Sequence, residues 1–226
     1  MAPPRGAIVL ADGAVPSRRL LDAAWPGWSD GGELVVAADG GARHAAALGL
    51  PIHVWVGDGD SVDPALLAHL VASGVDVRRM PAEKDETDTE LALRLAIDGG
   101  VTRIAVLGAL GGQRLDHAVA NLGLLTLRAG GPITRLYDEH ATRVALMTGP
   151  AAWKLVGRVG DIVSLIPVGD TARGVTTWYL EYPLEDEDLE LGRTRGVSNV
   201  RARESAKVQL KSGRLLVIET PVIVGS

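Results

Sequence analysis

The sequence predicts an α/β protein in which a parallel sheet with flanking helices precedes a small all-β region. Short apolar segments alternate with helical patterns up to about residue 138, whereas only strand patterns follow from about residue 141 to residue 226. The chain has 226 residues, enough for one large domain or two small ones. The change of pattern therefore predicts two domains, 1–140 and 141–226.

The elements of the first region follow from hydrophobic patterning. Segments typical of buried parallel strands lie at 7–11, 34–38, 54–56, 75–77, 104–107 and 133–137. Helical periodicity is present at 64–71, 89–97 and 117–127. The last of these segments is apolar on nearly every side, which predicts a buried helix.

The second region contains strand patterns and no convincing helix. Residues 161–168 and 174–178 have the composition of strands. Residues 208–210 and 215–219 flank the sequence Lys-Ser-Gly-Arg, which predicts a hairpin with a glycine-containing turn.

Composition excludes several classes of function. The chain has no cysteine, so disulfide frameworks, thiolate metal sites and cysteine nucleophiles are excluded. The net charge of −5 argues against a general nucleic-acid or anionic-membrane binder. The first residues lack an apolar signal segment, and no apolar run approaches the roughly 18 residues of a spanning helix. We expect a cytoplasmic protein.

Carboxylates are concentrated between residues 57 and 90, where nine acidic residues face only three basic ones. Two groups, at 57–61 and 84–88, follow the predicted strands at 54–56 and 75–77, and the second group opens a predicted helix. Ligands of open α/β sheets bind beyond the carboxyl ends of the strands, and Mg²⁺ prefers oxygen ligands. We expect the two groups to share a cation through Asp58, Asp60, Asp85 and Asp88.

Each carboxylate also has a structural alternative. Thr87 followed by Glu90 fits a capping box, and Asp39 in the turn Asp-Gly-Gly could cap a helix. A single carboxylate at a strand–helix turn is therefore weak evidence. The combination of the two acidic groups is stronger, because helix starts do not require so much like charge in one place.

A glycine-rich loop at 108–117 precedes the helix at 117–127. Gly111 and Gly112 allow close approach of a ligand, and Arg114 is a planar donor for phosphate oxygens. Asp116 could orient a ligand hydroxyl, bind metal or cap the helix, and Asn121 lies one turn further on the same side. His117 could take part in catalysis, and the structural alternative is that it packs or caps the helix.

The motifs in order resemble the thiamine pyrophosphokinase family. They are Ala38-Asp39-Gly40-Gly41, Gly57-Asp58-Gly59-Asp60-Ser61, the segment 84–93, the segment 111–121, Tyr182-Pro183-Leu184 and Gly196-Val197-Ser198-Asn199. The family usually has phenylalanine at the positions of Gly59 and Leu115, and this chain has no phenylalanine. Gln113 widens the usual Gly-Gly-Arg, while Tyr179 and Val200 replace a common Gly and Glu.

The resemblance implies a Rossmann-like ATP and Mg²⁺ domain at 1–140 and a β-sandwich at 141–226 that binds thiamine and forms a homodimer with shared active sites. It implies transfer of pyrophosphate from ATP to the hydroxyl of thiamine, which yields thiamine diphosphate and AMP. The residues with implied catalytic roles are Asp60, Asp85, Asp88, Arg114 and Asp116. The residues with implied substrate contacts are Asp39, Gly40, Lys84, Gly111, Gly112, Gln113, His117, Asn121, Tyr182, Ser198 and Asn199.

Two alternatives to this reaction remain open from the sequence. One is a Mg²⁺-dependent pyrophosphokinase for another small alcohol, such as a pterin. The other is a regulator that binds thiamine diphosphate or a nucleotide without catalysis.

Overall fold

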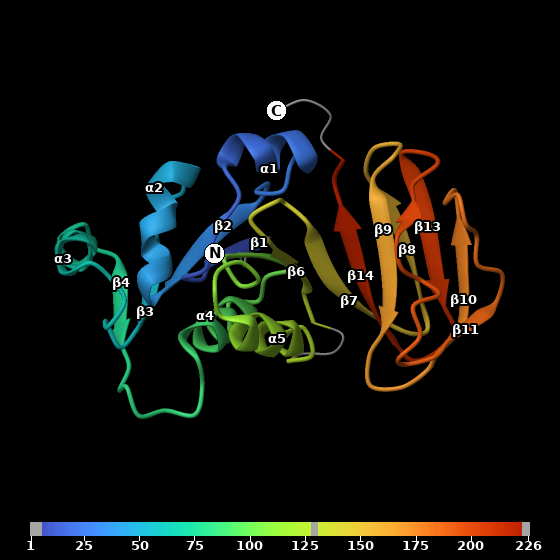
Figure 1. Cartoon of the computed structure of the whole chain (residues 1–226). Helices are drawn as coiled ribbons and strands as arrows, with labels where there is room; N and C mark the ends of the chain where they lie inside the picture. Colours follow the sequence, from blue (N-terminus) through green and yellow to red (C-terminus); the bar gives the residue numbers. More distant parts are fainter. Residues whose placement is uncertain (1–5, 128–130, 223–226) are drawn as a thin grey trace. The chain divides into compact units, whose positions relative to one another are not determined.

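A computed structural model describes residues 6–127 and 131–222. The chain divides into two compact units, Met1–Ala141 and Thr142–Ser226 (Figure 1). At this level the predicted class, an α/β region followed by an all-β region, is confirmed.

Six strands of the first unit pair in parallel, in the order β6-β5-β1-β2-β3-β4. They are β1 (Gly6–Leu10), β2 (Gly32–Ala38), β3 (Val54–Gly57), β4 (Asp76–Arg79), β5 (Arg103–Leu107) and β6 (Ile133–Tyr137). Strands β1 and β2 lie inside the order and are largely buried, as their apolar sequences predict. Strand β4 is an exception, because it lies at the edge and its residues, including Arg78 and Arg79, are mostly exposed.

Three of the helices of the first unit begin with a side-chain cap. The helices are α1 (Arg18–Ala24), η1 (Asp39–His44), α2 (Ala45–Leu48), α3 (Pro64–Ala72), α4 (Asp88–Asp98) and α5 (Leu115–Leu124). Asp63 caps α3 by accepting hydrogen bonds from the amides of Ala65 and Leu66. Thr87 caps α4 by accepting from the amide of Glu90, so the predicted cap is confirmed.

The prediction that the helix at 117–127 is buried is wrong. In α5 only Asn121 is buried, and its side chain donates to the carbonyl of Ala109 at 2.8 Å. Leu115 and Val119 are 76% and 60% exposed. Apolar composition shows that a helix can be buried, but the described part of this chain covers only one of its sides.

The second unit consists of two antiparallel sheets (Figure 1). One has the order β12-β9-β14-β7 and the other β11-β10-β13-β8. The strands are β7 (Arg143–Thr148), β8 (Ala151–Val156), β9 (Ile162–Pro167), β10 (Ala172–Trp178), β11 (Glu187–Leu189), β12 (Asn199–Val200), β13 (Ser205–Leu210) and β14 (Arg214–Thr220). A single hydrophobic cluster takes side chains from both sheets, including Leu165 and Val217 from one and Val175 and Val208 from the other.

The predicted hairpin at 208–219 is wrong, although both of its strands exist. Strand β13 pairs with β8 and β10, whereas β14 pairs with β7 and β9. The chain therefore crosses from one sheet to the other at residues 211–213. A turn signal marks where the chain reverses, but it does not determine which strand becomes the hydrogen-bonding partner.

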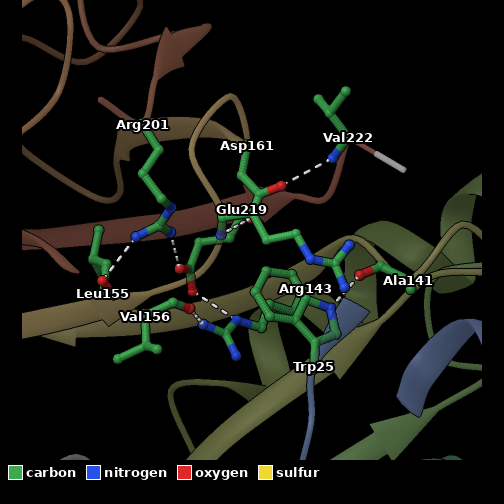
Figure 2. A network of polar contacts seen from close by, with 10 residues as sticks. Trp25, Ala141, Arg143, Leu155, Val156, Asp161, Arg201, Glu219 and Val222 are labelled. Carbon is green, nitrogen blue, oxygen red and sulfur yellow. Dashed lines mark hydrogen bonds and ion pairs between the residues drawn. The ribbon is translucent and has the colours of Figure 1, made fainter. Parts of the chain in front are cut away.

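A buried charged network lies within the second unit (Figure 2). Glu219 on β14 accepts from Arg201 Nη2 and from Arg143 Nε, both at 2.7 Å. Arg201 is fully buried and also donates to the carbonyl of Leu155. Asp161 is buried nearby and accepts from the amides of Arg158 and Val222. The network ties segments far apart in the sequence to the end of β14.

No described helix is both long enough and apolar enough to cross a membrane.

Candidate active site

A cleft of about 650 Å³ lies in the first unit, beyond the carboxyl ends of β1, β2, β3 and β5. Its lining comes from the segments that follow these strands and from the start of α4: Ala11–Ala14, Ala38, Asp39, Arg43, Asp58, Asp60, Ser61, Ala82, Lys84, Glu86–Thr89, Gly108, Ala109, Gly111–Arg114, His117 and Asn121. This is the edge at which open α/β sheets bind ligands.

Three carboxylates converge in this cleft. Asp39, Asp58 and Asp60 each offer a carboxylate oxygen, and these oxygens lie within 4.8 Å of one another. Asp60 is exposed, Asp58 is half-buried and Asp39 is buried. An all-oxygen anionic set fits a hard divalent cation such as Mg²⁺, and the chain offers no thiolate that would favour a softer metal.

Lys84 bridges two parts of the acidic cleft. Its ammonium lies 3.3 Å from Asp58 and 3.2 Å from Asp88. Burial alone would lower the pKa of Lys84, but hydrogen bonds and charge interactions with Asp88 and Asp58 raise it above its ordinary value. Lys84 is therefore a fixed cation between the two acidic segments.

The carboxylates of the cleft differ in their pKa. Burial raises the pKa of Asp88, and the ion pair with Lys84 only partly opposes this effect. The pKa of Asp58 is lowered, chiefly by the hydrogen bond from the amide of Asp60 and also by Lys84. Asp58 is thus held ionised, whereas Asp88 has a raised affinity for a proton.

The structure does not bring every predicted carboxylate into the cleft. Asp85, itself a described residue, is not among those that line the cleft, and the acidic group contains Asp39 in its place. Asp88 lines the cleft at the first residue of α4. In the segment 84–88 every residue except Asp85 lines the cleft, which a sequence pattern alone does not predict. The metal-binding role of Asp85 stays a prediction.

The glycine-rich loop and helix α5 also line the cleft. Gly111, Gly112, Gln113, His117 and Asn121 all contribute to the lining. Gly112 has a φ of 105°, a conformation that favours glycine.

Arg114 and Asp116 form a two-bond ion pair, at 2.9 and 2.6 Å. The hydrogen bonds from Arg114 hold the pKa of Asp116 well below its usual range. Arg114 lines the cleft and Asp116 does not.

Sequence reasoning missed two charged residues that line the cleft. Asp12 follows β1, and Arg43 lies in η1, where it forms an ion pair with Asp12 and donates to the carbonyl of Gly40. Gly40 itself is not in the lining, and a side chain there would meet Asp12 and Arg43. The position of Asp12 directly after a strand is the same signal that identified Asp58.

The candidate residues of the second unit are joined to one another. The side chain of Asn199 accepts from the amide of Tyr182 at 3.0 Å and donates to its carbonyl at 2.6 Å. The side-chain amide of Asn199 thus binds the backbone of Tyr182, and the side chain of Tyr182 is exposed. Ser198 has a φ of 59°, and its amide donates to Ser164 Oγ. Tyr182 and Ser198 are therefore exposed, whereas Asn199 is buried.

Gly59 lies in the turn between Asp58 and Asp60 with a φ of 88°. A side chain at this position is strained, so Gly59→Ala is expected to lower the free energy of unfolding by more than about 1 kcal/mol. Gly123→Ala is the matched control. Gly123 lies in α5, where an added methyl group would meet nothing within 4 Å, so this variant should be more stable than the parent. Urea unfolding of both variants measures the difference, and equal stability of Gly59→Ala and the parent would contradict the strained turn.

Two family models match this chain. The thiamin pyrophosphokinase catalytic domain matches residues 28–133, and the thiamin pyrophosphokinase vitamin B1 binding domain matches residues 155–215. Together they cover well over half of the chain and follow the order of the two units.

Individual relatives agree with these matches. Thiamine pyrophosphokinase from Bacillus subtilis is 26% identical over 197 residues, covering 86% of this chain and 90% of the relative. The crystal structure of thiamine pyrophosphokinase from the same species has a TM-score of 0.83 at 23% identity and covers 96% of this chain and all of that one. The structure of a thiamin pyrophosphokinase family protein from Enterococcus faecalis has a TM-score of 0.76 at 26% identity and covers 97% of this chain and all of that one. The chain, with its carboxylate cleft in the first unit and its two-sheet second unit, belongs to the thiamine pyrophosphokinase family.

Proposed function

We propose that this protein transfers the pyrophosphoryl group of ATP to the hydroxyl of thiamine, with thiamine diphosphate and AMP as products. The observation that supports this most directly is the cleft at the carboxyl ends of the strands, within the segment that matches the catalytic-domain model. The cleft combines carboxylates for a cation with Lys84, Arg114 and a glycine-rich loop for phosphates. The pterin and regulator alternatives are not favoured, because the family models and the curated relatives all carry the thiamine activity in their names.

Transfer of a phosphoryl-type group needs positioning and charge neutralisation more than covalent help from the protein. We assign Asp58 and Asp60 to hold Mg²⁺, which when bound would neutralise phosphate oxygens and polarise the bond that breaks. Lys84 and Arg114 lie in the same cleft and would contact the remaining phosphate oxygens. Gly112, which lines the cleft, would let the phosphates approach the backbone, whereas Gly111 is required by the close approach of Ala14 and Glu139.

The hydroxyl oxygen of thiamine attacks the β-phosphorus, the bond between the α–β bridging oxygen and the β-phosphorus breaks, and AMP leaves with that oxygen. The hydroxyl proton needs an acceptor. We assign Asp88 to orient the alcohol and take this proton, because it lines the cleft and burial raises its pKa. Asp116 is the weaker candidate, because it does not line the cleft and its carboxylate is paired with Arg114.

We further propose that the second unit is a β-sandwich that supplies thiamine contacts through Tyr182 and Ser198, and that the protein is a cytoplasmic homodimer. The vitamin B1 binding model over residues 155–215 supports the thiamine contacts. The exposed Leu115 and Val119 of α5 support an assembly that covers them.

Purified protein with ATP, Mg²⁺ and thiamine tests the reaction, with products separated by mass. We expect AMP and thiamine diphosphate in equal amounts, and no comparable AMP release with a pterin alcohol. AMP release without thiamine diphosphate would contradict the proposed acceptor.

Metal removal gives a second test. Excess chelator is expected to lower turnover by at least about 100-fold, because a bound cation commonly supplies several kcal/mol of transition-state stabilisation. Added Mg²⁺ should restore the rate fully. Unchanged turnover in chelator would exclude the assigned role of Asp58 and Asp60.

A further inference from the structure

Asp12 and Arg43 form an ion pair in the wall of the cleft, and the proposed reaction gives neither of them a role. Asp12 follows β1, and Arg43 lies in η1. The Arg43 guanidinium donates to Oδ1 and to the main-chain carbonyl of Asp12, and it also donates to the carbonyl of Gly40 at 3.1 Å. Three acceptors therefore hold one cation, although both side chains are about half exposed.

The turn Asp39-Gly40-Gly41 brings η1 against the end of β1. A Cβ at Gly41 would collide with the backbone of β1, and a Cβ at Gly40 would collide with the carboxylate of Asp12. Asp39 has a φ of 42°, an uncommon conformation for a residue with a side chain, and no described side chain caps η1, so the helix-cap alternative for Asp39 is wrong. The two glycines thus allow the close packing through which Arg43 reaches Asp12.

The segment after β1 is also fixed on its other side, against the glycine-rich loop. The amide of Gly13 donates to the carbonyl of Gly108 at 3.0 Å, and a Cβ at Gly13 would collide with the carbonyls of Gly108 and Gly111. A Cβ at Gly108 would in turn collide with the carbonyl of Ala11. Asp12 is therefore held by neighbours on both sides, and a ligand would meet a preformed acceptor at little cost in ordering.

The strand order places this ion pair at the switch point of the parallel sheet. Strand β1 lies between β2 and β5, so the chain continues to β2, β3 and β4 on one side of it and to β5 and β6 on the other. Ligands of open α/β sheets bind across this point. The acidic group follows β2 and β3, and the glycine-rich loop follows β5. A nucleotide bound across the switch point therefore passes the ion pair of Asp12 and Arg43.

The chemistry of the ion pair suits an uncharged group that donates hydrogen bonds. The pair has no net charge, and its carboxylate would repel a phosphate. Oδ2 of Asp12 has no hydrogen-bond partner among the residues that the structure describes. An ionised carboxylate only accepts hydrogen bonds, so its partner must be a donor. In ATP the donors nearest to the phosphates are the two ribose hydroxyls.

We propose that Asp12, oriented by Arg43, accepts a hydrogen bond from a ribose hydroxyl of the nucleotide through Oδ2, and that it makes the protein selective for ribonucleotides. The identity of the nucleotide as ATP rests on the proposed function. Asp12 contacts the substrate in this arrangement, and Arg43 is a positioning residue. A site built to bind a substrate hydroxyl rejects the analogue that lacks it, because the acceptor then loses its donor.

Binding of ATP, 2′-deoxyATP and 3′-deoxyATP to the whole chain, measured by calorimetry with Mg²⁺ and without thiamine, tests the proposal without turnover. We expect the parent to bind ATP at least about tenfold more tightly than one of the two analogues. This preference should fall below about twofold in Asp12→Ala. Asp76→Ala removes a carboxylate that pairs with Arg78 outside the cleft, and it should keep the preference of the parent. Equal affinity of the parent for all three nucleotides would overturn the proposal, whether or not the variants fold.

Arg43→Ala separates positioning from phosphate binding. If Arg43 orients Asp12, the variant should lose much of its affinity for ATP and keep its affinity for the disfavoured analogue within about twofold. If Arg43 instead contacts a phosphate, the variant should bind all three nucleotides more weakly by the same factor. The second result would overturn the proposal.

Thiamine is the other molecule with a hydroxyl in the proposed reaction. A higher KM for thiamine in Asp12→Ala, with an unchanged preference for ATP over its analogues, would place thiamine at Asp12 and overturn the proposal. The outcomes for this proposal and for the proposed function are distinct. Formation of thiamine diphosphate with equal use of ATP and both analogues refutes the ribose contact and leaves the function intact. A preference for ATP that depends on Asp12, without conversion of thiamine, refutes the function and leaves the ribose contact intact.

Discussion

Asp60→Asn is expected to lower the rate of thiamine diphosphate formation by about 100- to 1000-fold with little change in stability. Asp60 is exposed and follows β3, and its carboxylate belongs to the group of Asp39, Asp58 and Asp60. The lower rate should therefore result from weaker cation binding and not from a less stable fold. The measurement is turnover at saturating Mg²⁺ and ATP, beside the melting temperature of the same preparation.

Two further variants sharpen this experiment. Asp76→Asn carries the same charge change outside the cleft and should keep most of the parent's rate. Asp85→Asn should cost far less than Asp60→Asn, since Asp85 does not line the cleft. Equal losses in Asp60→Asn and Asp85→Asn would mean that the acidic segment before α4 rearranges to bring Asp85 to the cation.

The second large effect is expected in stability. Glu219→Gln removes a carboxylate that binds both Arg143 and Arg201 in the network of Figure 2. Arg201 is fully buried, so the substitution leaves an uncompensated charge in the interior. Breaking a buried pair in this way costs about 3–5 kcal/mol. Urea unfolding should show this loss, and the exposed Glu204→Gln provides a charge-matched control.

A double variant distinguishes the contribution of the charge pair between Glu219 and Arg201 from that of the hydrogen bond that Arg201 donates to the Leu155 carbonyl. Glu219→Met with Arg201→Met removes both buried charges and should recover a large part of the stability that Glu219→Gln loses. If the double variant is as unstable as the sum of the two single variants, the network acts through its hydrogen bonds to the Leu155 carbonyl and not through the charge pair.

Part of this fold could be predicted because it depends on local patterns. The apolar segments of β1, β2 and β5 are short and continuous, and such segments form buried parallel strands. Thr87 capped α4 as expected, since a cap involves residues three positions apart. The position of the cleft also followed from the sequence, because the carboxyl ends of parallel strands meet at one edge.

Other features depend on contacts between distant residues. The partners of β13 and β14 lie in different sheets, and alternation within each strand does not contain that information. The exposure of α5 is likewise decided by what packs against it, not by its composition.

The acidic cleft shows the same division at the level of single residues. The order of the motifs and the excess of carboxylates between residues 57 and 90 already predicted a carboxylate-rich cleft after the strands. Only the tertiary structure decided which carboxylates meet there. Asp39 enters the group from β2, through a strained backbone held by Trp55 and a close approach of Gly57, whereas Asp85 lies outside the lining. The reason is that ligand geometry depends on the direction of each side chain, which is set by packing between strands and not by spacing along the chain.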